Sequence, residues 1–309
     1  MADHAGAFSE EQVIARLREI FTSADPRIEI GIGDDAAVVV GSKRQVLTTD
    51  MAVENIHFRT QWSSGFEIGR KITAANTADV LAMGAVPDYL LVAVGLTGSE
   101  SLEWISELAR GIKYEADLAG AHVVGGDISR AEQIVISMAA VGTTDNAILR
   151  IGAKPGDGIY LSSLTGWSAA GLALLKSEAE IAGKEAAKAL SEFKSPTIDY
   201  GFDTTGASAL CDVSDALATQ AAQMAESSGV AFKFDLAKIS GSAEFAQLES
   251  LANAMQIDIW QWIFSGGEDH VLLATGKDLS GILIGEVEAG SGLHNLPTGV
   301  AATAWSHFN

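Results

Sequence analysis

Along the chain, stretches with apolar residues at helical spacing alternate with short runs of β-branched and apolar residues. Residues 66–83 have this helical spacing and are followed by Gly84, so they predict a helix that ends there. A second helix is predicted over 101–118. Strands are predicted over six apolar segments: 28–30, 36–40, 45–49, 89–94, 122–124 and 133–141. Such mixing predicts an α+β or α/β architecture.

A cluster of turn-forming residues divides the chain near its middle. Residues 150–157 read Arg-Ile-Gly-Ala-Lys-Pro-Gly-Asp. Beyond them we predict a strand over 158–162, an alanine-rich helical region over 168–191 and a polar loop over 195–206. The segment therefore predicts two domains, 1–150 and 151–309.

The N-terminal residues predict neither a secretion signal nor a membrane span. Ser9 and Gln12 form a capping-box pattern before an amphipathic helix. The longest apolar run, 89–94, is far shorter than the roughly 20 residues that cross a bilayer. A single cysteine, Cys211, fits a reducing compartment and is expected to be a buried small residue. We expect a soluble, cytoplasmic protein.

Composition adds a strong acidic bias. The 309 residues include 20 Lys or Arg and 40 Asp or Glu, which gives a net charge of −20. Nucleic-acid binding is disfavoured, because it needs clustered basic side chains. A hydrophobic fraction of 48% is enough for a large core, so the acidity does not indicate disorder.

Acidic residues recur beside small or glycine residues, where we expect tight turns. Carboxylates in such places can bind Mg²⁺, which takes oxygen ligands together with water and phosphate. The alternative is that each is an ordinary turn residue. The five segments are Gly33-Asp34-Asp35, Thr48-Thr49-Asp50, Gly125-Gly126-Asp127, Asp212-Val213-Ser214-Asp215 and Gly266-Gly267-Glu268-Asp269.

Asp79 stands on the apolar stripe of the helix predicted over 66–83. An inward carboxylate needs a cation or hydrogen-bond donors. It is a candidate metal ligand, and the alternative is an ion pair with a residue such as Arg70 or Lys71.

Asp212 and Asp215 also have two interpretations. The pattern resembles the capping groups of a helix N-terminus, which is also a place where phosphate binds, with Ser214 as a possible donor. The two interpretations are compatible.

Two common nucleotide sites are excluded. Gly31-Ile32-Gly33 imitates a dinucleotide fingerprint, but a strand follows it where a helix is required. No Walker-type loop is present either.

Seven motifs in order resemble the thiamine-monophosphate kinase family, within the superfamily of aminoimidazole ribonucleotide synthetase. They begin at Gly31, Thr49, Asn76, Gly125, Arg150, Asp212 and Gly266. The resemblance implies an N-terminal mixed-sheet domain that dimerises through its sheet and a C-terminal α/β domain. It also implies a homodimer that transfers the γ-phosphoryl group of ATP to thiamine phosphate with several Mg²⁺ ions.

The resemblance also assigns roles to particular residues. Asp127, Arg150, Asp212 and Asp215 correspond to catalytic positions, and Gly126, Asp127, Arg150 and Ser214 to ATP contacts. The implied Mg²⁺ ligands are Asp34, Thr48, Thr49, Asp50, Asp79, Asp127, Asp212 and Asp215. The implied thiamine phosphate contacts are His57, Glu268 and Trp305.

Two positions depart from the family pattern. Ile128 stands where the family usually has a hydroxyl residue, and His270 where it has a tyrosine. Two other functions stay open. One is another ATP-dependent synthetase of the superfamily, acting on a purine precursor or related small molecule. The other is a non-catalytic protein that binds divalent metal ions.

Overall fold

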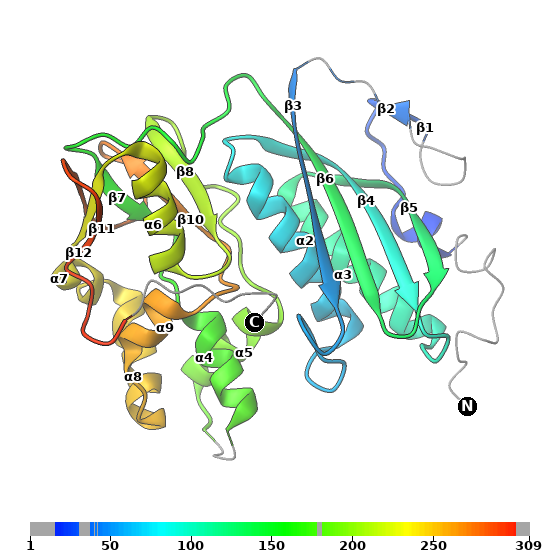
Figure 1. Ribbon diagram of the computed structural model, residues 1–309. Coiled ribbons are helices and arrows are strands. Elements are labelled where there is room, and N and C mark those ends of the chain that lie inside the picture. Colours follow the sequence, from blue (N-terminus) through cyan, green and yellow to red (C-terminus); the bar gives the residue numbers. More distant parts are fainter. Residues whose placement is uncertain (1–15, 31–37, 40, 42, 178–180, 301–309) are drawn as a thin grey trace. The chain divides into compact units, whose positions relative to one another are not determined.

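The computed structural model describes residues 16–30, 38–39, 41, 43–177 and 181–300. The chain divides into two compact units (Figure 1). One contains Met1–Val80 and Ala85–Asn146, and the other Leu81–Gly84 and Ala147–Asn309.

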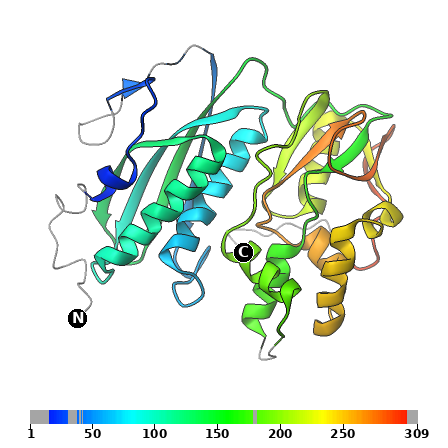
Figure 2. The same ribbon diagram turned by 180° about the vertical axis from the view of Figure 1, so that it is seen from behind.

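The N-terminal unit is built on a four-stranded sheet with the order β3-β6-β4-β5. β4 and β5 are parallel and the other neighbours are antiparallel. Helices α2 and α3 both cover one face of this sheet (Figures 1 and 2). The elements are β1 (Ile28–Ile30), β2 (Val38–Val39), β3 (Arg44–Val53), α2 (Gly65–Leu81), β4 (Val86–Leu96), α3 (Leu102–Ala119), β5 (His122–Arg130) and β6 (Val135–Thr144).

The two helices begin at side-chain caps and pack closely. Ser64 and Glu67 form a capping box before α2, and Ser101 caps α3 through the Trp104 amide. A Cβ on Gly111 would lie 2.0 Å from the carbonyl oxygen of Phe66. This approach of α3 to α2 is therefore possible only because residue 111 has no side chain.

Helices α2 and α3 cover one face of the sheet, and the opposite face is exposed (Figures 1 and 2). Residues of β6 alternate, and Ile136, Met138 and Ala140 are buried beneath the helices. Leu47 and Met51, which alternate with inward residues of β3, are 71% and 56% exposed. The face opposite α2 and α3 is thus partly apolar and open within the described residues.

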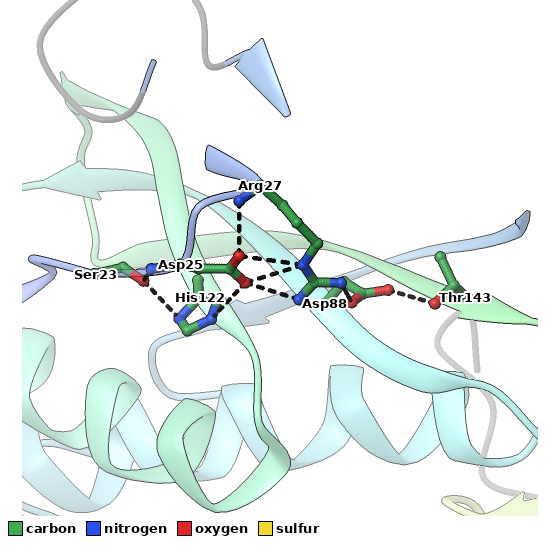
Figure 3. Close-up of polar contacts among 6 residues, drawn as sticks. All are labelled: Ser23, Asp25, Arg27, Asp88, His122 and Thr143. Atoms are coloured by element: carbon green, nitrogen blue, oxygen red, sulfur yellow. Dashed lines mark hydrogen bonds and ion pairs between the residues drawn. The ribbon is translucent and has the colours of Figure 1, made fainter. Parts of the chain in front are cut away.

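A polar network connects the segment before β1 to the sheet (Figure 3). Arg27 donates to Asp25 at 2.8 Å and to the buried carboxylate of Asp88 at 2.6 Å, and Thr143 donates to Asp88 at 2.7 Å. The hydrogen bonds from Arg27 lower the pKa of Asp25 to about 2. His122 lies 3.1 Å from the same carboxylate. Residues 25–27 are therefore attached to β4, β5 and β6.

The C-terminal unit has a six-stranded sheet with the order β12-β9-β11-β7-β10-β8, in which only β12 and β9 pair in parallel. Phe232, Phe264 and Ile284 lie in its main buried cluster. Its strands are β7 (Gly158–Leu161), β8 (Ala207–Val213), β9 (Ala231–Phe234), β10 (Val271–Gly276), β11 (Ile282–Glu288) and β12 (Gly292–His294). Its helices are α4 (Trp167–Lys176), α5 (Lys184–Lys194), α6 (Leu217–Ser228), α7 (Leu236–Ser240), α8 (Ala243–Met255) and α9 (Ile259–Ser265).

The helical region predicted over 168–191 is confirmed, and it consists of two helices. These are α4 and α5, and Gly183 precedes the second with a φ of 134° that a continuous helix would not allow. The helices predicted over 66–83 and 101–118 are confirmed by α2 and α3.

The prediction of turns at two of the acidic segments was wrong. Thr48 to Asp50 lie inside β3, and Gly125 to Asp127 lie inside β5. Both strands extend beyond their β-branched residues, because pairing with β6 and β4 continues through them. No helix within the described residues is long and apolar enough to cross a membrane.

Candidate functional site

Three of the implied metal ligands meet where β3 lies against α2. Thr48 and Asp50 alternate with exposed residues of β3 and point toward the helices. The hydroxyl of Thr48 donates to Oδ2 of Asp79 at 2.7 Å, and the amide of Asp50 donates to Oδ1 of Asn76 at 3.2 Å. Asn76 precedes Asp79 by one turn of α2. The structure thus brings Thr48, Asp50 and Asp79 together.

Arg70, one of the alternative partners for Asp79, is engaged elsewhere. Its Nε donates to the fully buried carboxylate of Glu115 at 2.9 Å. Asp79 itself is half-buried. Glu115 is thus one partner of Arg70, and the alternative ion pair of Asp79 with Arg70 or Lys71 stays a prediction.

Asp127 lies away from this group within one chain. Asp50 pairs with Met138, Met138 with Val92, and Val92 with Gly126. Three strand spacings of about 4.8 Å separate the two edges by about 14 Å. Asp127 is aligned with Met51 across the sheet through the paired residues Ser137 and Ala93, so it lies on the open face. Thr49 points to the same face. Asp50 and Asp127 of the same chain therefore cannot bind one ion together.

In the C-terminal unit, the segment 212–215 meets the segment 266–270. The amide of Glu268 donates to the carbonyl of Ser214 at 2.6 Å, and the amide of His270 donates to that of Val213 at 2.9 Å. A Cβ on Gly267 would lie 2.3 Å from the Asp215 carbonyl oxygen. Two motifs more than 50 residues apart in the sequence therefore form one group of polar side chains.

Asp269 attaches this loop to α4. Its carboxylate accepts from the amides of Gly166 at 2.8 Å and Ser168 at 2.9 Å, at the N-terminus of that helix. Burial raises the pKa of Asp269 to about 6, against the lowering effect of those two hydrogen bonds. Glu268 and His270, on either side, both have positive φ, 66° and 52°.

The capping interpretation of Asp212 and Asp215 was wrong. The N-cap of α6 is Ala216, without a side-chain cap, and its amide donates to Oε1 of Gln220 at 3.0 Å. Nε2 of the same glutamine lies 3.4 Å from Oδ2 of Asp215. The carboxylates of Asp212 and Asp215 therefore do not cap α6.

The implied ATP contacts Arg150 and Gly126 lie in different units. Arg150 is exposed and donates from Nη1 to Oε1 of Gln223 on α6. A Cβ on Gly126 would lie 1.9 Å from the carbonyl oxygen of Val92, so strand packing alone requires glycine there.

His57 follows β3 in a tight turn and has a defined tautomer. Its backbone amide donates to the Val53 carbonyl at 2.9 Å, and the Val53 amide donates to its Nδ1 at 3.1 Å. Because Nδ1 accepts, the ring proton is on Nε2. The half-buried ring can therefore act as a donor through Nε2.

Two implied site residues, Asp34 and Trp305, lie outside the described residues. Among the residues that the structure describes, no three His, Cys, Asp or Glu side chains form a cluster able to bind a metal ion. The groups present are pairs of hard oxygen donors, which suit Mg²⁺ that is also coordinated by phosphate and water.

Known proteins share both sequence and fold with this chain. The AIR synthase related protein N-terminal domain matches residues 33–144. The thiamine-monophosphate kinase of Mycobacterium tuberculosis is 38% identical over 252 residues, which cover 79% of this chain and 74% of that protein. The chain belongs to the thiamine-monophosphate kinase family.

Solved structures of this family agree with the fold. The thiamine-monophosphate kinase of Stenotrophomonas maltophilia superposes with a TM-score of 0.80 at 27% identity, covering 93% of this chain and 96% of that one. A structure described as AaThiL in complex with AMPPCP and TMP has a TM-score of 0.79 at 30% identity, covering 97% of each chain. The expected two-domain fold is thereby confirmed.

The two departures from the family pattern have different surroundings. Ile128 packs beside the apolar cluster of Leu96 and Ile105, so its methyl groups contribute to the N-terminal unit. His270 is buried, and its Nδ1 lies 3.3 Å from Oδ2 of Asp212. The first change is explained by packing, and the second touches an implied metal ligand.

The sequence analysis assigned no site contact to four side chains that support the site. These are Asn76, Gln220, Gln223 and His270. Asn76 carries a usable signal, because a polar residue one helical turn before Asp79 lies on the same face. His270, which contacts Asp212, and Gln223, which contacts Arg150, are each more than 50 residues away from their partner in the sequence. No local pattern therefore indicates these two contacts.

Proposed function

We propose that this protein transfers the γ-phosphoryl group of ATP to thiamine phosphate and produces thiamine diphosphate and ADP. The observation that carries the proposal is family membership at 38% identity, together with a structural relative described as binding AMPPCP and TMP. The paired oxygens of Thr48 and Asp79 are consistent with it.

The acceptor chemistry agrees with the side chains present. Thiamine phosphate is a phosphate monoester and is largely ionised near neutral pH, so its attacking oxygen needs little deprotonation. Phosphoryl transfer then depends on positioning and on compensation of negative charge. We therefore assign no general base to this chain.

Mg²⁺ fits the donor set, which consists of carboxylate and hydroxyl oxygens. When bound, the ions neutralise phosphate oxygens and bring the two anions within reach. We propose as ligands the side chains or backbone of eight residues: Asp34, Thr48, Thr49, Asp50, Asp79, Asp127, Asp212 and Asp215. The assignment of Thr48 and Asp79 as ligands is supported by the hydrogen bond between them on the inner face of β3.

Other side chains contact the two substrates in this proposal. Arg150 compensates triphosphate charge, and the Ser214 hydroxyl donates to a phosphate oxygen. His57 donates from Nε2 to the acceptor phosphate, which its tautomer allows. Gly126 contacts ATP, while Glu268 and Trp305 contact thiamine phosphate.

We also propose a homodimer formed through the open face of the N-terminal sheet. Leu47, Met51 and Leu91 are 71%, 56% and 43% exposed on this face. Asp127 shares the face, so a dimer would include it in the interface.

Light scattering should give twice the mass of one chain, and Met51→Asp should give a monomer. Leu118→Asp, on the far side of the domain on α3, should remain dimeric; a monomeric wild type would contradict the proposal.

We also propose a cytoplasmic location, where ATP is available; the free thiol of Cys211 fits such a reducing compartment.

The activity has a direct assay. Purified protein with ATP, Mg²⁺ and thiamine phosphate should form equal amounts of thiamine diphosphate and ADP. A synthetase of the superfamily would instead release free phosphate with another acceptor. A non-catalytic metal-binding protein would bind divalent ions without Mg²⁺-dependent affinity for ATP. Either result would refute the kinase activity.

A further inference from the structure

The carboxylate of Asp212 and the ring of His270 meet in a buried pair. Asp212 is 5% exposed at the end of β8 and His270 is 8% exposed just before β10. Nδ1 of His270 lies 3.3 Å from Oδ2 of Asp212. An ionised carboxylate only accepts hydrogen bonds, so Nδ1 carries the proton of this contact.

One oxygen of Asp212 is engaged in this way and the other is not. Within the described residues, no hydrogen bond reaches Oδ1 of Asp212. A buried carboxylate with a single donor is incompletely compensated, because burial of its charge is costly without further partners. The arrangement leaves Oδ1 able to coordinate a cation.

The backbone fixes His270 in this position independently of its ring. Its φ of 52° is uncommon for a residue with a side chain and persists only where the surroundings enforce it. Its amide donates to the Val213 carbonyl at 2.9 Å, and the preceding Asp269 is attached to the N-terminus of α4. The backbone of His270 is therefore held by contacts with two separate elements, β8 and α4.

We propose that His270 is a positioning residue that orients Asp212 for a divalent cation. Its Nδ1–H occupies Oδ2 and fixes the rotation of the carboxylate, so that Oδ1 is presented to the metal. This inference rests on the proposed function, in which Asp212 is a Mg²⁺ ligand. Partners that orient metal ligands typically change metal affinity by about 10- to 100-fold.

Two substitutions of His270 separate the effect of its hydrogen bond to Asp212 from the effect of its packing. His270→Asn keeps a donor near the position of Nδ1 and tolerates positive φ, whereas His270→Leu has a similar size and no donor. The readout is Mn²⁺ affinity, measured by electron paramagnetic resonance of free Mn²⁺ in the presence of AMPPCP. We expect His270→Leu to weaken Mn²⁺ binding by about 10- to 100-fold and His270→Asn by no more than about 3-fold. Equal affinity of His270→Leu and the wild type would overturn the proposal.

Asp212→Asn, measured in the same way, separates this inference from the proposed function. If Asp212→Asn loses Mn²⁺ affinity and His270→Leu does not, only the role of His270 is refuted. If Asp212→Asn also binds normally, Asp212 is not a ligand and the metal assignment itself fails.

A measurement on the wild type covers the case in which His270→Leu does not fold. Nitrogen-15 spectra of the histidine rings distinguish the two neutral tautomers, and His270→Asn identifies the signal by its loss. The proposal requires the Nδ1–H form at His270. The Nε2–H form would overturn it, because Nδ1 could then not donate to Asp212.

Discussion

The hydroxyl of Thr48 donates to the carboxylate of Asp79 at 2.7 Å and connects the edge strand β3 to helix α2. A hydroxyl that donates its proton still has oxygen lone pairs. Thr48 and Asp79 can therefore serve one cation together. The contact also gives a hydrogen-bond donor to the half-buried carboxylate of Asp79 on α2.

Replacing Asp79 by Asn should remove activity without removing the fold. The amide oxygen of Asn can accept the Thr48 hydrogen bond, but the negative charge is lost. We expect Asp79→Asn to lower kcat by at least about 100-fold, with a thermal midpoint within a few degrees of the wild type. Asp117→Asn, at an exposed acid on α3 paired with Lys113, is the matched control and should keep full activity. A normal rate in Asp79→Asn would refute its assignment as a ligand.

Gly111 tests the close packing of α3 on α2. Helix propensity alone predicts that Gly111→Ala stabilises α3 by up to about 1 kcal/mol. The new methyl group would lie 2.0 Å from the Phe66 carbonyl oxygen, so the helices would have to separate. We expect a loss of about 1–3 kcal/mol in urea unfolding. Leu118→Ala on the same helix, at a half-exposed side chain, should change stability by less than about 0.5 kcal/mol. A gain in Gly111→Ala would mean that propensity outweighs the contact.

The ion pair between Arg70 and Glu115 should show asymmetric costs. Glu115 is fully buried and Arg70 is 19% exposed at its side chain. Removal of Arg70 takes a cationic partner away from a fully buried carboxylate, and breaking a buried ion pair in this way costs about 3–5 kcal/mol. Arg70→Met should therefore destabilise strongly, and the double variant Arg70→Met with Glu115→Leu should recover most of the loss. If the double variant is no more stable than Arg70→Met alone, desolvation of Glu115 is not the cause.

The sequence predicted local features better than long-range ones. The extent of α2 follows from its apolar spacing and from Gly84, both of which are local signals. The acidic segment ending at Asp127 instead contains two glycines, which indicate a turn, and lies in β5 because β4 pairs with it throughout. Strand pairing is a property of the partner strand, which a reading of one segment does not include.

The same limit applies to the candidate site. The contact between Thr48 and Asp79 and the contact between Asp212 and His270 each connect residues far apart in sequence. The sequence indicated three of these residues through the chemistry of their side chains or through family resemblance. It did not indicate that His270 reaches Asp212, because that contact depends on the register of β8 with β10.

Asp269 should make stability depend on pH in a direction opposite to that of a typical carboxylate. Its pKa is raised from 3.8 to about 6 in the folded protein, chiefly by burial. The contribution to stability is therefore complete below pH 3.8 and is lost as the pH rises through about 6. We expect the unfolding free energy of the wild type, relative to Asp269→Asn, to fall by about 2–3 kcal/mol across this range and to stay constant above it. Denaturant unfolding at a series of pH values measures the difference, in which the titration of other groups cancels. A difference that increases with pH would show that the hydrogen bonds from Gly166 and Ser168 outweigh the desolvation of the carboxylate.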